Sequence, residues 1–281
     1  MNIHSSVTDT NGITHQWVFD FELIFFDQEK FLWIEDLMYN WWWLSIPYAL
    51  LYIIAIFIGQ TWMRKRDEKF ELRKLLIIWN TILTIFSFWG ACRCVPELIY
   101  TLNNYGFLYS VCDPSYKKGI TGLWAWLFMA SKVPETLDTL FIVLRRQPLI
   151  FLHWYHHATV LVYCFYSYGI FVSTGRWFIS MNYCVHTIMY GYFALRAARI
   201  RLPRFLQQFV TILQLIQMII GCFINLAVFN YKQHGYLCAT SDINIKLSLA
   251  LYASYLILFV HFFYTSYLQK DSMKKSNKKM Y

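Results

Sequence analysis

Charged residues are scarce in this chain, and their scarcity argues against an ordinary soluble protein. Only 15% of the 281 residues are Asp, Glu, Lys or Arg, whereas 58% are hydrophobic and 20% are aromatic. About 20 consecutive, mostly apolar residues are enough to cross a bilayer. We therefore expect an all-α membrane protein with seven transmembrane helices, at 42–62, 75–99, 121–144, 149–171, 177–198, 205–230 and 246–268.

Several other sequence patterns are missing. The seven cysteines form no CxxC pair, and no module of alternating basic and aromatic residues suggests nucleic-acid binding. The first thirty residues lack a basic segment followed by an apolar core, so we expect no cleavable signal peptide. We expect a lumenal N-terminal segment 1–41, a membrane domain 42–268 and a cytosolic basic tail 269–281, with 1–16 and 270–281 poorly ordered.

Lysine and arginine are distributed unevenly among the predicted loops. Of the 25 such residues, 17 fall on one side of the membrane, which the positive-inside rule identifies as the cytosol. The C-terminus is then cytosolic and the N-terminus is not, as an odd number of spans also requires. Anionic lipid headgroups or a phosphate-bearing substrate would both suit this charge. The 17 residues are Arg64, Lys65, Arg66, Lys69, Arg73, Lys74, Arg145, Arg146, Arg196, Arg199, Arg201, Arg204, Lys270, Lys274, Lys275, Lys278 and Lys279.

Two cysteines fall in predicted loops on the opposite, non-cytosolic side. An oxidising lumen would permit a disulfide between Cys112 and Cys238, and we predict one. Two free thiols are the alternative.

Three histidines lie inside an apolar stretch of the fourth predicted span, as an HxxHH pattern at His153, His156 and His157. Positions i, i+3 and i+4 share one helix face. Polar groups at membrane depth are costly and face a cavity or a partner, so the pattern favours catalysis. A structural histidine cluster and a metal site, since i, i+4 histidines can share an ion, are the alternatives.

The third span carries a charged stretch at Lys132, Glu135, Asp138 and Thr139, and Pro134 should kink the helix there. This stretch is either an internal salt-bridge cluster or part of a site. Further polar stripes follow in the fifth and sixth spans, for which helix contacts and a cavity lining are both open. Their members are Asn182, His186, Met189, Tyr190, Thr211, Gln214 and Gln217.

Arg93 and Glu97 are four residues apart in the second span, and we expect them to pair with each other. Arg93 could also face a phosphate group.

Together these stretches resemble the motifs of the very-long-chain fatty acid elongases, the 3-ketoacyl-CoA synthases of the endoplasmic reticulum membrane. KxPExxDT, HxxHH, NxxxHxxMY and TxxQxxQ occur in that order in the third to sixth spans. The chain is similar to the animal branch that acts on saturated and monounsaturated acyl chains. Pro148 stands where the polyunsaturated branch usually has Gln.

The resemblance implies condensation of a long-chain acyl-CoA with malonyl-CoA, giving 3-ketoacyl-CoA, CoA and carbon dioxide. It implies no cofactor or metal, and a barrel formed by the last six spans around an acyl-chain tunnel. It also implies partner enzymes that complete the cycle: a ketoacyl reductase, a dehydratase and an enoyl reductase. Lys278 and Lys279 resemble a di-lysine retrieval signal. A homo-oligomer is left open.

The resemblance also suggests roles for individual residues. His156 would be the nucleophile, because a neutral imidazole can attack a thioester and carry the acyl group. His153 and His157 would orient it or move protons, and Asn182 and His186 would activate malonyl-CoA and stabilise the enolate. The expected substrate-binding residues are Lys132, Glu135, Asp138, Thr139, Arg93, Tyr190, Gln214 and Gln217.

Three alternatives remain. A di-iron membrane desaturase or hydroxylase needs roughly eight histidine ligands, but His4, His15 and His234 lie on the non-cytosolic side. A cysteine nucleophile would have to be Cys164, about two helical turns deeper than the histidines, or Cys184, which points away from them. A non-enzymatic seven-span receptor or transporter explains the spans but not the four motifs.

Overall fold

The computed structural model describes residues 3–9 and 12–269. The chain starts with an antiparallel hairpin of β1 (Ile3–Thr8) and β2 (Thr14–Phe19), in which Ile3 pairs with Phe19. Helical segments follow almost without interruption: η1 (Asp20–Phe26), α1 (Gln28–Trp41), η2 (Trp42–Leu44), α2 (Ser45–Arg64), α3 (Arg73–Cys112), η3 (Ser115–Lys117), α4 (Gly119–Glu135), α5 (Leu137–Leu144), α6 (Phe151–Gly169), α7 (Gly175–Ala197), α8 (Arg204–Gln233), α9 (Asp242–Phe263) and η4 (Tyr264–Gln269).

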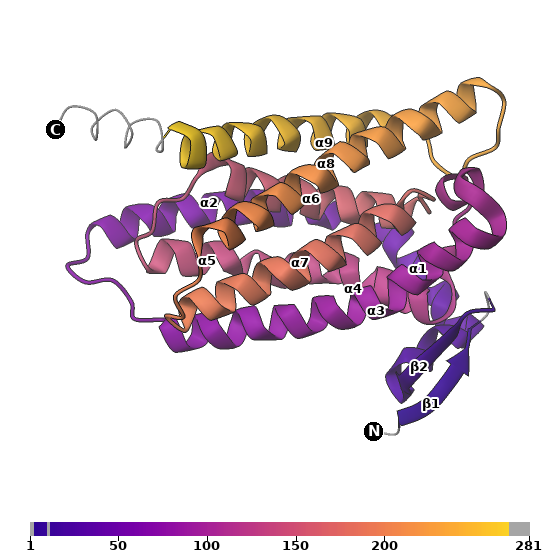
Figure 1. Ribbon diagram of the computed structural model, residues 1–281, viewed down its shortest axis with the longest axis horizontal. Coiled ribbons are helices and arrows are strands. Elements are labelled where there is room, and N and C mark those ends of the chain that lie inside the picture. The colour runs from indigo at the N-terminus through magenta and orange to yellow at the C-terminus, as the bar shows by residue number, and fades with distance from the viewer. Residues whose placement is uncertain (1–2, 10–11, 270–281) are drawn as a thin grey trace.

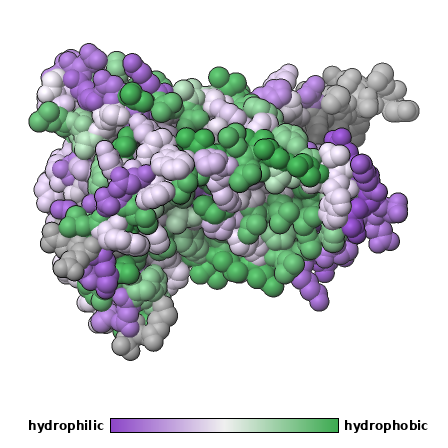
Figure 2. All heavy atoms as spheres, turned by 180° about the vertical axis from the view of Figure 1, so that it is seen from behind, coloured by the Kyte–Doolittle hydropathy of each residue, from purple (hydrophilic) through white to green (hydrophobic). Residues whose placement is uncertain are grey.

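The long helices run side by side between two ends of the molecule (Figure 1). One end, which we call the basic end, holds the α2–α3, α5–α6 and α7–α8 connections and the last turns of the chain. These are the loops in which the sequence concentrates Lys and Arg. The opposite end, the hairpin end, holds β1, β2, α1 and the α8–α9 loop. Figure 2 shows hydrophobic side chains across the middle and hydrophilic ones toward both ends.

Among the residues that the structure describes, four helical stretches are long and apolar enough to cross a membrane: Lys30–Arg64, Arg73–Cys112, Arg204–Gln233 and Asp242–Gln269. Large apolar side chains on them face outward, among them Leu51, Ile58 and Ile257. α6, which carries the three histidines, and α7, which carries a polar stripe, are not among these four stretches, because their polar residues lower the mean hydropathy. The protein is therefore a helical, multi-pass membrane protein, and four of its spans stand out by length and composition alone.

The predicted third span, 121–144, is two helices. α4 ends at Glu135 and α5 begins at Leu137, one turn after Pro134. Proline lacks an amide proton and its ring clashes with the preceding turn, so the break falls where the sequence placed a kink. α3 also bends, at Gly106, whose φ of 80° is accessible to glycine at little cost.

Two expectations about the N-terminal half are wrong. Residues 1–16 were expected to lack order, but 3–8 and 14–19 form the hairpin. Arg93 and Glu97 do not pair with each other. Arg93 binds Glu22 through Nε–Oε1 at 2.8 Å and Nη2–Oε2 at 2.9 Å, whereas Glu97 binds Arg176 at 3.0 Å. The bidentate contact between the Arg93 guanidinium and the Glu22 carboxylate, which lie on different elements, has better geometry than a monodentate contact with Glu97 along the same helix would have.

The Glu22 carboxylate fastens the hairpin end to the helices. It accepts hydrogen bonds from Arg93, from Trp124 Nε1 at 2.6 Å and from the Phe19 amide at 2.8 Å. Burial alone would raise the pKa of Glu22, but these donors hold it below its usual value. Arg93 also donates to the carbonyls of Gln16 and Trp17. β2 and η1 are thereby fixed against α3 and α4.

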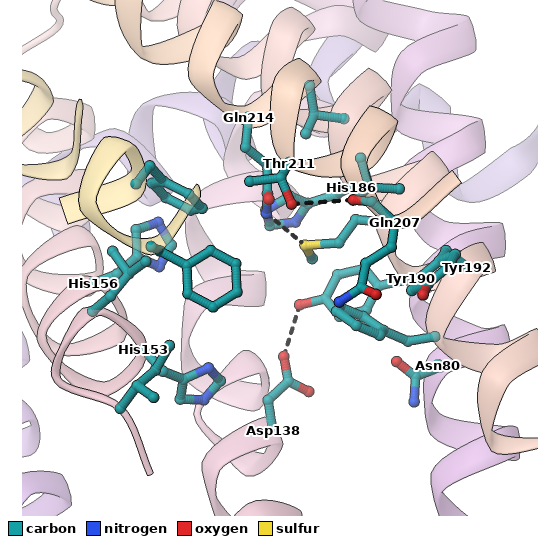
Figure 3. Close-up of a pocket in the computed structure, with 18 of the residues that line it drawn as sticks. Asn80, Asp138, His153, His156, His186, Tyr190, Tyr192, Gln207, Thr211 and Gln214 are labelled. Atoms are coloured by element: carbon teal, nitrogen blue, oxygen red, sulfur yellow. Dashed lines mark hydrogen bonds between the residues drawn. The ribbon is translucent and has the colours of Figure 1, made fainter. Parts of the chain in front are cut away.

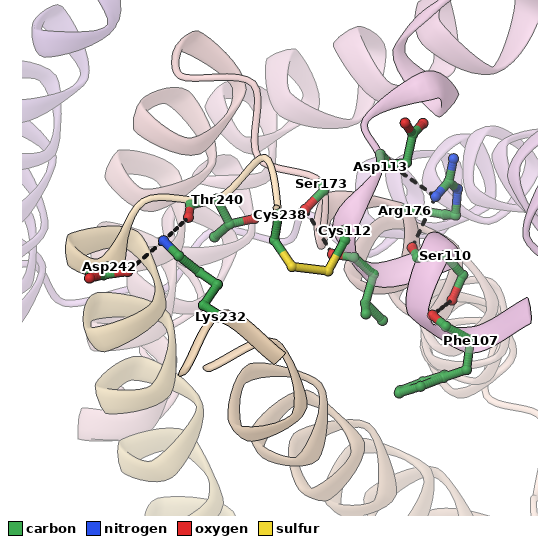
Figure 4. Close-up of a disulfide and its surroundings, with 11 residues drawn as sticks. Phe107, Ser110, Cys112, Asp113, Ser173, Arg176, Lys232, Cys238, Thr240 and Asp242 are labelled. Carbon is green, nitrogen blue, oxygen red and sulfur yellow. Dashed lines mark hydrogen bonds and ion pairs between the residues drawn. A yellow bond between two sulfur atoms is a disulfide. The ribbon is translucent and has the colours of Figure 1, made fainter. Parts of the chain in front are cut away.

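A disulfide joins Cys112, at the end of α3, to Cys238 in the α8–α9 loop, 126 residues later (Figure 4). The predicted pairing is confirmed. Beside it, Ser173 Oγ donates to the Val111 carbonyl at 2.7 Å, and the Arg176 guanidinium donates to the carbonyls of Ser110 and Asp113. The hairpin end is thus tied together covalently and by buried polar contacts. The tail 270–281 lies outside the described residues.

Candidate active site

A cavity of about 540 Å³ opens among α3, α5, α6, α7, α8, the end of α9 and η4, near the basic end (Figure 3). Its walls combine imidazole, amide, phenol and carboxyl groups with apolar side chains. Polar groups gathered in a largely apolar cavity are the usual composition of a small-molecule site. Of the predicted residues, the wall includes Asp138, His153, His156, His157, Asn182, His186, Met189, Tyr190, Thr211, Gln214 and Gln217.

All three histidines of α6 reach this cavity, as the i, i+3, i+4 spacing predicts. The ring centroids of His153 and His157 are 4.5 Å apart, and those of His156 and His157 are 5.5 Å apart. His157 is buried, whereas His153 and His156 keep part of their surface accessible. The His156 ring packs edge-on against Tyr255 of α9, with centroids 5.0 Å apart. The imidazoles therefore form one connected group.

The polar stripe of α7 faces the same cavity. Asn182, His186 and Tyr190 all contribute to its wall, and the His186 and Tyr190 ring centroids lie 5.2 Å apart. His186 therefore lines the same cavity as the three histidines of α6. A second helix thus supplies an amide, an imidazole and a phenol opposite the histidines of α6.

Lys132 and Glu135 lie behind the cavity rather than on its wall. Lys132 Nζ contacts the two Glu135 oxygens at 2.8 and 3.0 Å, and both side chains are buried. Lys132 Nζ also donates to Asn182 Oδ1 at 3.4 Å. With its oxygen engaged in this way, the Asn182 amide keeps its N–H donors for other partners. The pair is both an internal salt bridge and a support for Asn182.

Asp138 and Thr139 lie in the first turn of α5 and form hydrogen bonds with different neighbours. Tyr190 OH donates to Asp138 Oδ2 at 2.8 Å, and Trp79 Nε1 donates to Asp138 Oδ1 at 2.6 Å. Thr139 is fully buried and does not line the cavity, but its Oγ1 lies 2.9 Å from His153 Nε2. The two residues thus hold a cavity phenol and a cavity histidine in place.

On α8, the polar stripe both lines the cavity and contacts other helices. Gln214 Nε2 donates to Met189 Sδ of α7 at 3.2 Å, and Thr211 Oγ1 lies 3.1 Å from Tyr267 OH. These residues therefore both make contacts between helices and line the cavity, which are the two interpretations that the sequence left open. Arg93, in contrast, does not line this cavity, and its guanidinium binds Glu22 of η1 and two carbonyls of β2 instead.

Several wall residues had no sequence signal. Asn80, Tyr192, Gln207 and Tyr267 belong to the cavity but lie outside the four motifs. Arg145 and Arg196 also reach it. Arg145 directly follows α5 and Arg196 lies in the last turn of α7, on the side that the charge pattern assigned to the cytosol. The end of the cavity nearest the basic end is therefore positively charged.

A second, smaller cavity of about 50 Å³ lies toward the hairpin end. Cys164 belongs to this cavity and not to the one with the histidines, together with Phe128, Met129, Tyr163 and Ile179. Cys184 is exposed. Within 3–9 and 12–269, no three or more His, Cys, Asp or Glu side chains are grouped to hold a metal ion, so the di-iron alternative gains no support from donor geometry.

This combination defines a class: a mainly helical membrane enzyme with an imidazole-rich cavity between its helices, and with a short N-terminal β-hairpin that the all-α expectation did not include. The sequence profile of the ELO, or GNS1/SUR4, family matches residues 37–275, and the chain belongs to this family. A very long chain fatty acid elongase 6 of Drosophila melanogaster is 50% identical over 278 residues, covering 98% of this chain and 85% of the relative. Proteins of the same name from Gallus gallus and Homo sapiens are 46% and 45% identical, over 90% and 92% of this chain and 94% and 96% of their own lengths.

Proposed function

We propose that the protein is the condensing enzyme of fatty acid elongation, which joins a long-chain acyl-CoA to malonyl-CoA. Its products are a 3-ketoacyl-CoA, free CoA and carbon dioxide. Family membership and relatives named as elongases support this activity. The observation that carries the proposal is that the three histidines of α6 line the same cavity as Asn182 and His186 of α7.

In the first step, the neutral His156 ring attacks the thioester carbon of the acyl-CoA. The carbon–sulfur bond breaks, CoA leaves as a thiolate that is then protonated, and the acyl group stays on the imidazole. Part of the His156 surface is accessible to the cavity, and no residue within the described ranges hydrogen-bonds its ring. Both facts favour it as the attacking group.

In the second step, malonyl-CoA loses carbon dioxide and becomes an enolate, whose carbon attacks the acyl carbon and displaces His156. Negative charge collects on the enolate oxygen, so donors aimed at that oxygen lower the barrier. The N–H groups of Asn182 and a ring N–H of His186 are suitable donors. Lys132 contributes by holding Asn182 Oδ1, rather than by contacting CoA itself.

The two ends of the cavity suit the two ends of the substrate. Arg145 and Arg196 offer cations for the CoA phosphates. We infer that an acyl tunnel runs from the histidines toward the hairpin end and includes the smaller cavity around Cys164. We infer seven spans, the last six of them forming a barrel around this tunnel. We further infer an endoplasmic reticulum location with the basic end in the cytosol, and association with the other enzymes of the elongation cycle.

The test is release of labelled carbon dioxide from malonyl-CoA by the purified protein in detergent. Release that depends on added long-chain acyl-CoA, with 3-ketoacyl-CoA formed in equal amount, supports condensation. Release without acyl-CoA, or none at all, contradicts it. Iron in stoichiometric amount together with oxygen-dependent desaturation would favour the di-iron alternative.

The covalent step needs its own measurement. Incubation with acyl-CoA alone, digestion and mass spectrometry should reveal an acyl group on the peptide that contains His156. A His156→Ala variant should lack the adduct and the activity. His261→Ala is the matched control, because His261 is an exposed histidine on α9 that does not line the cavity. Full turnover by a folded His156→Ala protein would remove this mechanism.

A further inference from the structure

Tyr52 is a buried tyrosine on α2, a helix that contributes no residue to the cavity wall. Only 8% of its surface is exposed, and it packs with Ile56, Val143 and Ala158 between α2, α5 and α6. Its hydroxyl lies 2.6 Å from Thr139 Oγ1, which in turn lies 2.9 Å from His153 Nε2. A continuous chain of two hydrogen bonds therefore connects α2 to the active-site histidines.

The chemistry of the three groups gives this chain a direction. The Thr139 hydroxyl has one proton, so it can donate to only one of its two neighbours. An unprotonated imidazole nitrogen accepts more strongly than a phenol oxygen, and a phenol donates more strongly than an alkyl hydroxyl. Tyr52 therefore donates to Thr139, and Thr139 donates to His153 Nε2. The proton of the neutral His153 ring is then on Nδ1, since the bond at one ring nitrogen decides the state of the other.

We propose that Tyr52 is a positioning residue for His153, acting through Thr139. This inference rests on the proposed role of the histidines in condensation. The chain fixes the orientation and tautomer of the His153 ring and occupies the Nε2 lone pair. His153 then presents an N–H to the site rather than a nucleophilic nitrogen. The nucleophile is left to His156, whose ring has no such partner among the described residues.

The same helix offers a matched control one turn earlier. The Tyr48 hydroxyl lies 3.0 Å from Thr136 Oγ1, so it makes the same kind of contact across the same interface. Thr136 donates to the Val133 carbonyl at 2.7 Å and contacts no histidine. Replacing either tyrosine with Phe removes one hydroxyl from the α2 interface. Only the change at Tyr52 interrupts the path to His153.

The experiment compares Tyr52→Phe and Tyr48→Phe in the full-length protein. We measure kcat and KM for condensation, CoA release with acyl-CoA alone, and thermal denaturation in detergent. Tyr52→Phe should lower kcat about tenfold with little change in KM, which corresponds to one hydrogen bond of about 1.4 kcal/mol. Tyr48→Phe should stay within about twofold of the unsubstituted protein. Equal effects of the two substitutions would overturn the proposal.

A double-substitution cycle separates positioning from general packing. Thr139→Val should lose at least as much activity as Tyr52→Phe, and Thr139→Ser should retain most of it because the hydroxyl remains. In the Thr139→Val background, Tyr52→Phe should cost nothing more. A further tenfold loss there would show that Tyr52 does not act through Thr139. If the Tyr52→Phe protein does not fold, the comparison of Thr139→Ser with Thr139→Val tests the proposal. Equal kcat values for these two variants would refute a role for the hydrogen bonds that connect Tyr52 to His153. An inactive unsubstituted protein in these assays would instead refute the proposed function.

Discussion

Removing the disulfide between Cys112 and Cys238 should weaken the fold without disabling the active site. The two cysteines are 126 residues apart. Closing a loop of that length lowers the entropy of a fully flexible unfolded chain by an amount worth about 5 kcal/mol. The helices between them stay in the lipid when tertiary structure is lost, so the unfolded chain has less freedom to restrict. We therefore expect a loss of about 2–4 kcal/mol for the double Cys→Ser variant.

Thermal denaturation of the purified protein in detergent measures this loss. For a chain of this size it corresponds to a fall in Tm of about 5–15 °C. Reductant should lower the Tm of the unsubstituted protein by a similar amount and leave that of the double variant unchanged. Cys222→Ser is the control, because Cys222 is a free cysteine in the same hydrophobic cluster. Condensation at low temperature should be retained, since the histidine cavity is near the other end of the molecule.

An unchanged Tm in the double variant would show that the bond carries no stabilising role. A reductant effect that persists in the double variant would show that the reductant acts somewhere other than this bond. A loss of activity at temperatures where the variant is fully folded would show that the two ends of the molecule are coupled.

Three further outcomes are expected. Glu22→Gln should leave Arg93 buried without its anion and thereby destabilise the fold by about 3–5 kcal/mol. The loss should be visible as earlier proteolysis of the hairpin, and an unaltered digestion pattern would contradict this. Burial lowers the pKa of Lys117 to about 7, partly offset by Glu35. The unfolded chain keeps this proton to about pH 10.4, so between pH 7 and 9 it binds more protons than the folded chain. The difference in Tm between the unsubstituted protein and Lys117→Met should therefore rise from pH 7 to 9 in favour of the unsubstituted protein. A constant difference in Tm would contradict this expectation. Cys164→Phe should fill the smaller cavity and shorten the products, and an unshifted product profile by gas chromatography would place the acyl chain elsewhere.

The parts of the site that follow a local period could be predicted from the sequence. Three histidines within one helical turn and a half must share a face, and the structure places all of them on one cavity. The break near Pro134 and the gathering of basic loops at one end also follow from local rules. Each of these features needs only neighbouring residues to be evident.

Apart from the disulfide, most features that depend on partners far along the chain were missed. Glu97 lies one turn from Arg93, yet each charge found a partner on another element, 71 and 79 residues away. Nothing local distinguishes Trp79 or Tyr52 from the other aromatic residues of apolar helices. Their roles depend on which helix faces which, and hydrophobic periodicity alone does not determine that packing.

The Glu22–Arg93 pair also constrains the order in which this protein can be assembled. Glu22 leaves the ribosome long before Arg93 and Trp124, which later neutralise and cover it. Until those residues arrive, the Glu22 carboxylate on η1 must stay hydrated. The segment that carries Glu22 precedes both partners in the chain and is therefore among the last to dock. A large N-terminal fusion partner would hinder this late closure, whereas the same partner at the other terminus would leave it unhindered.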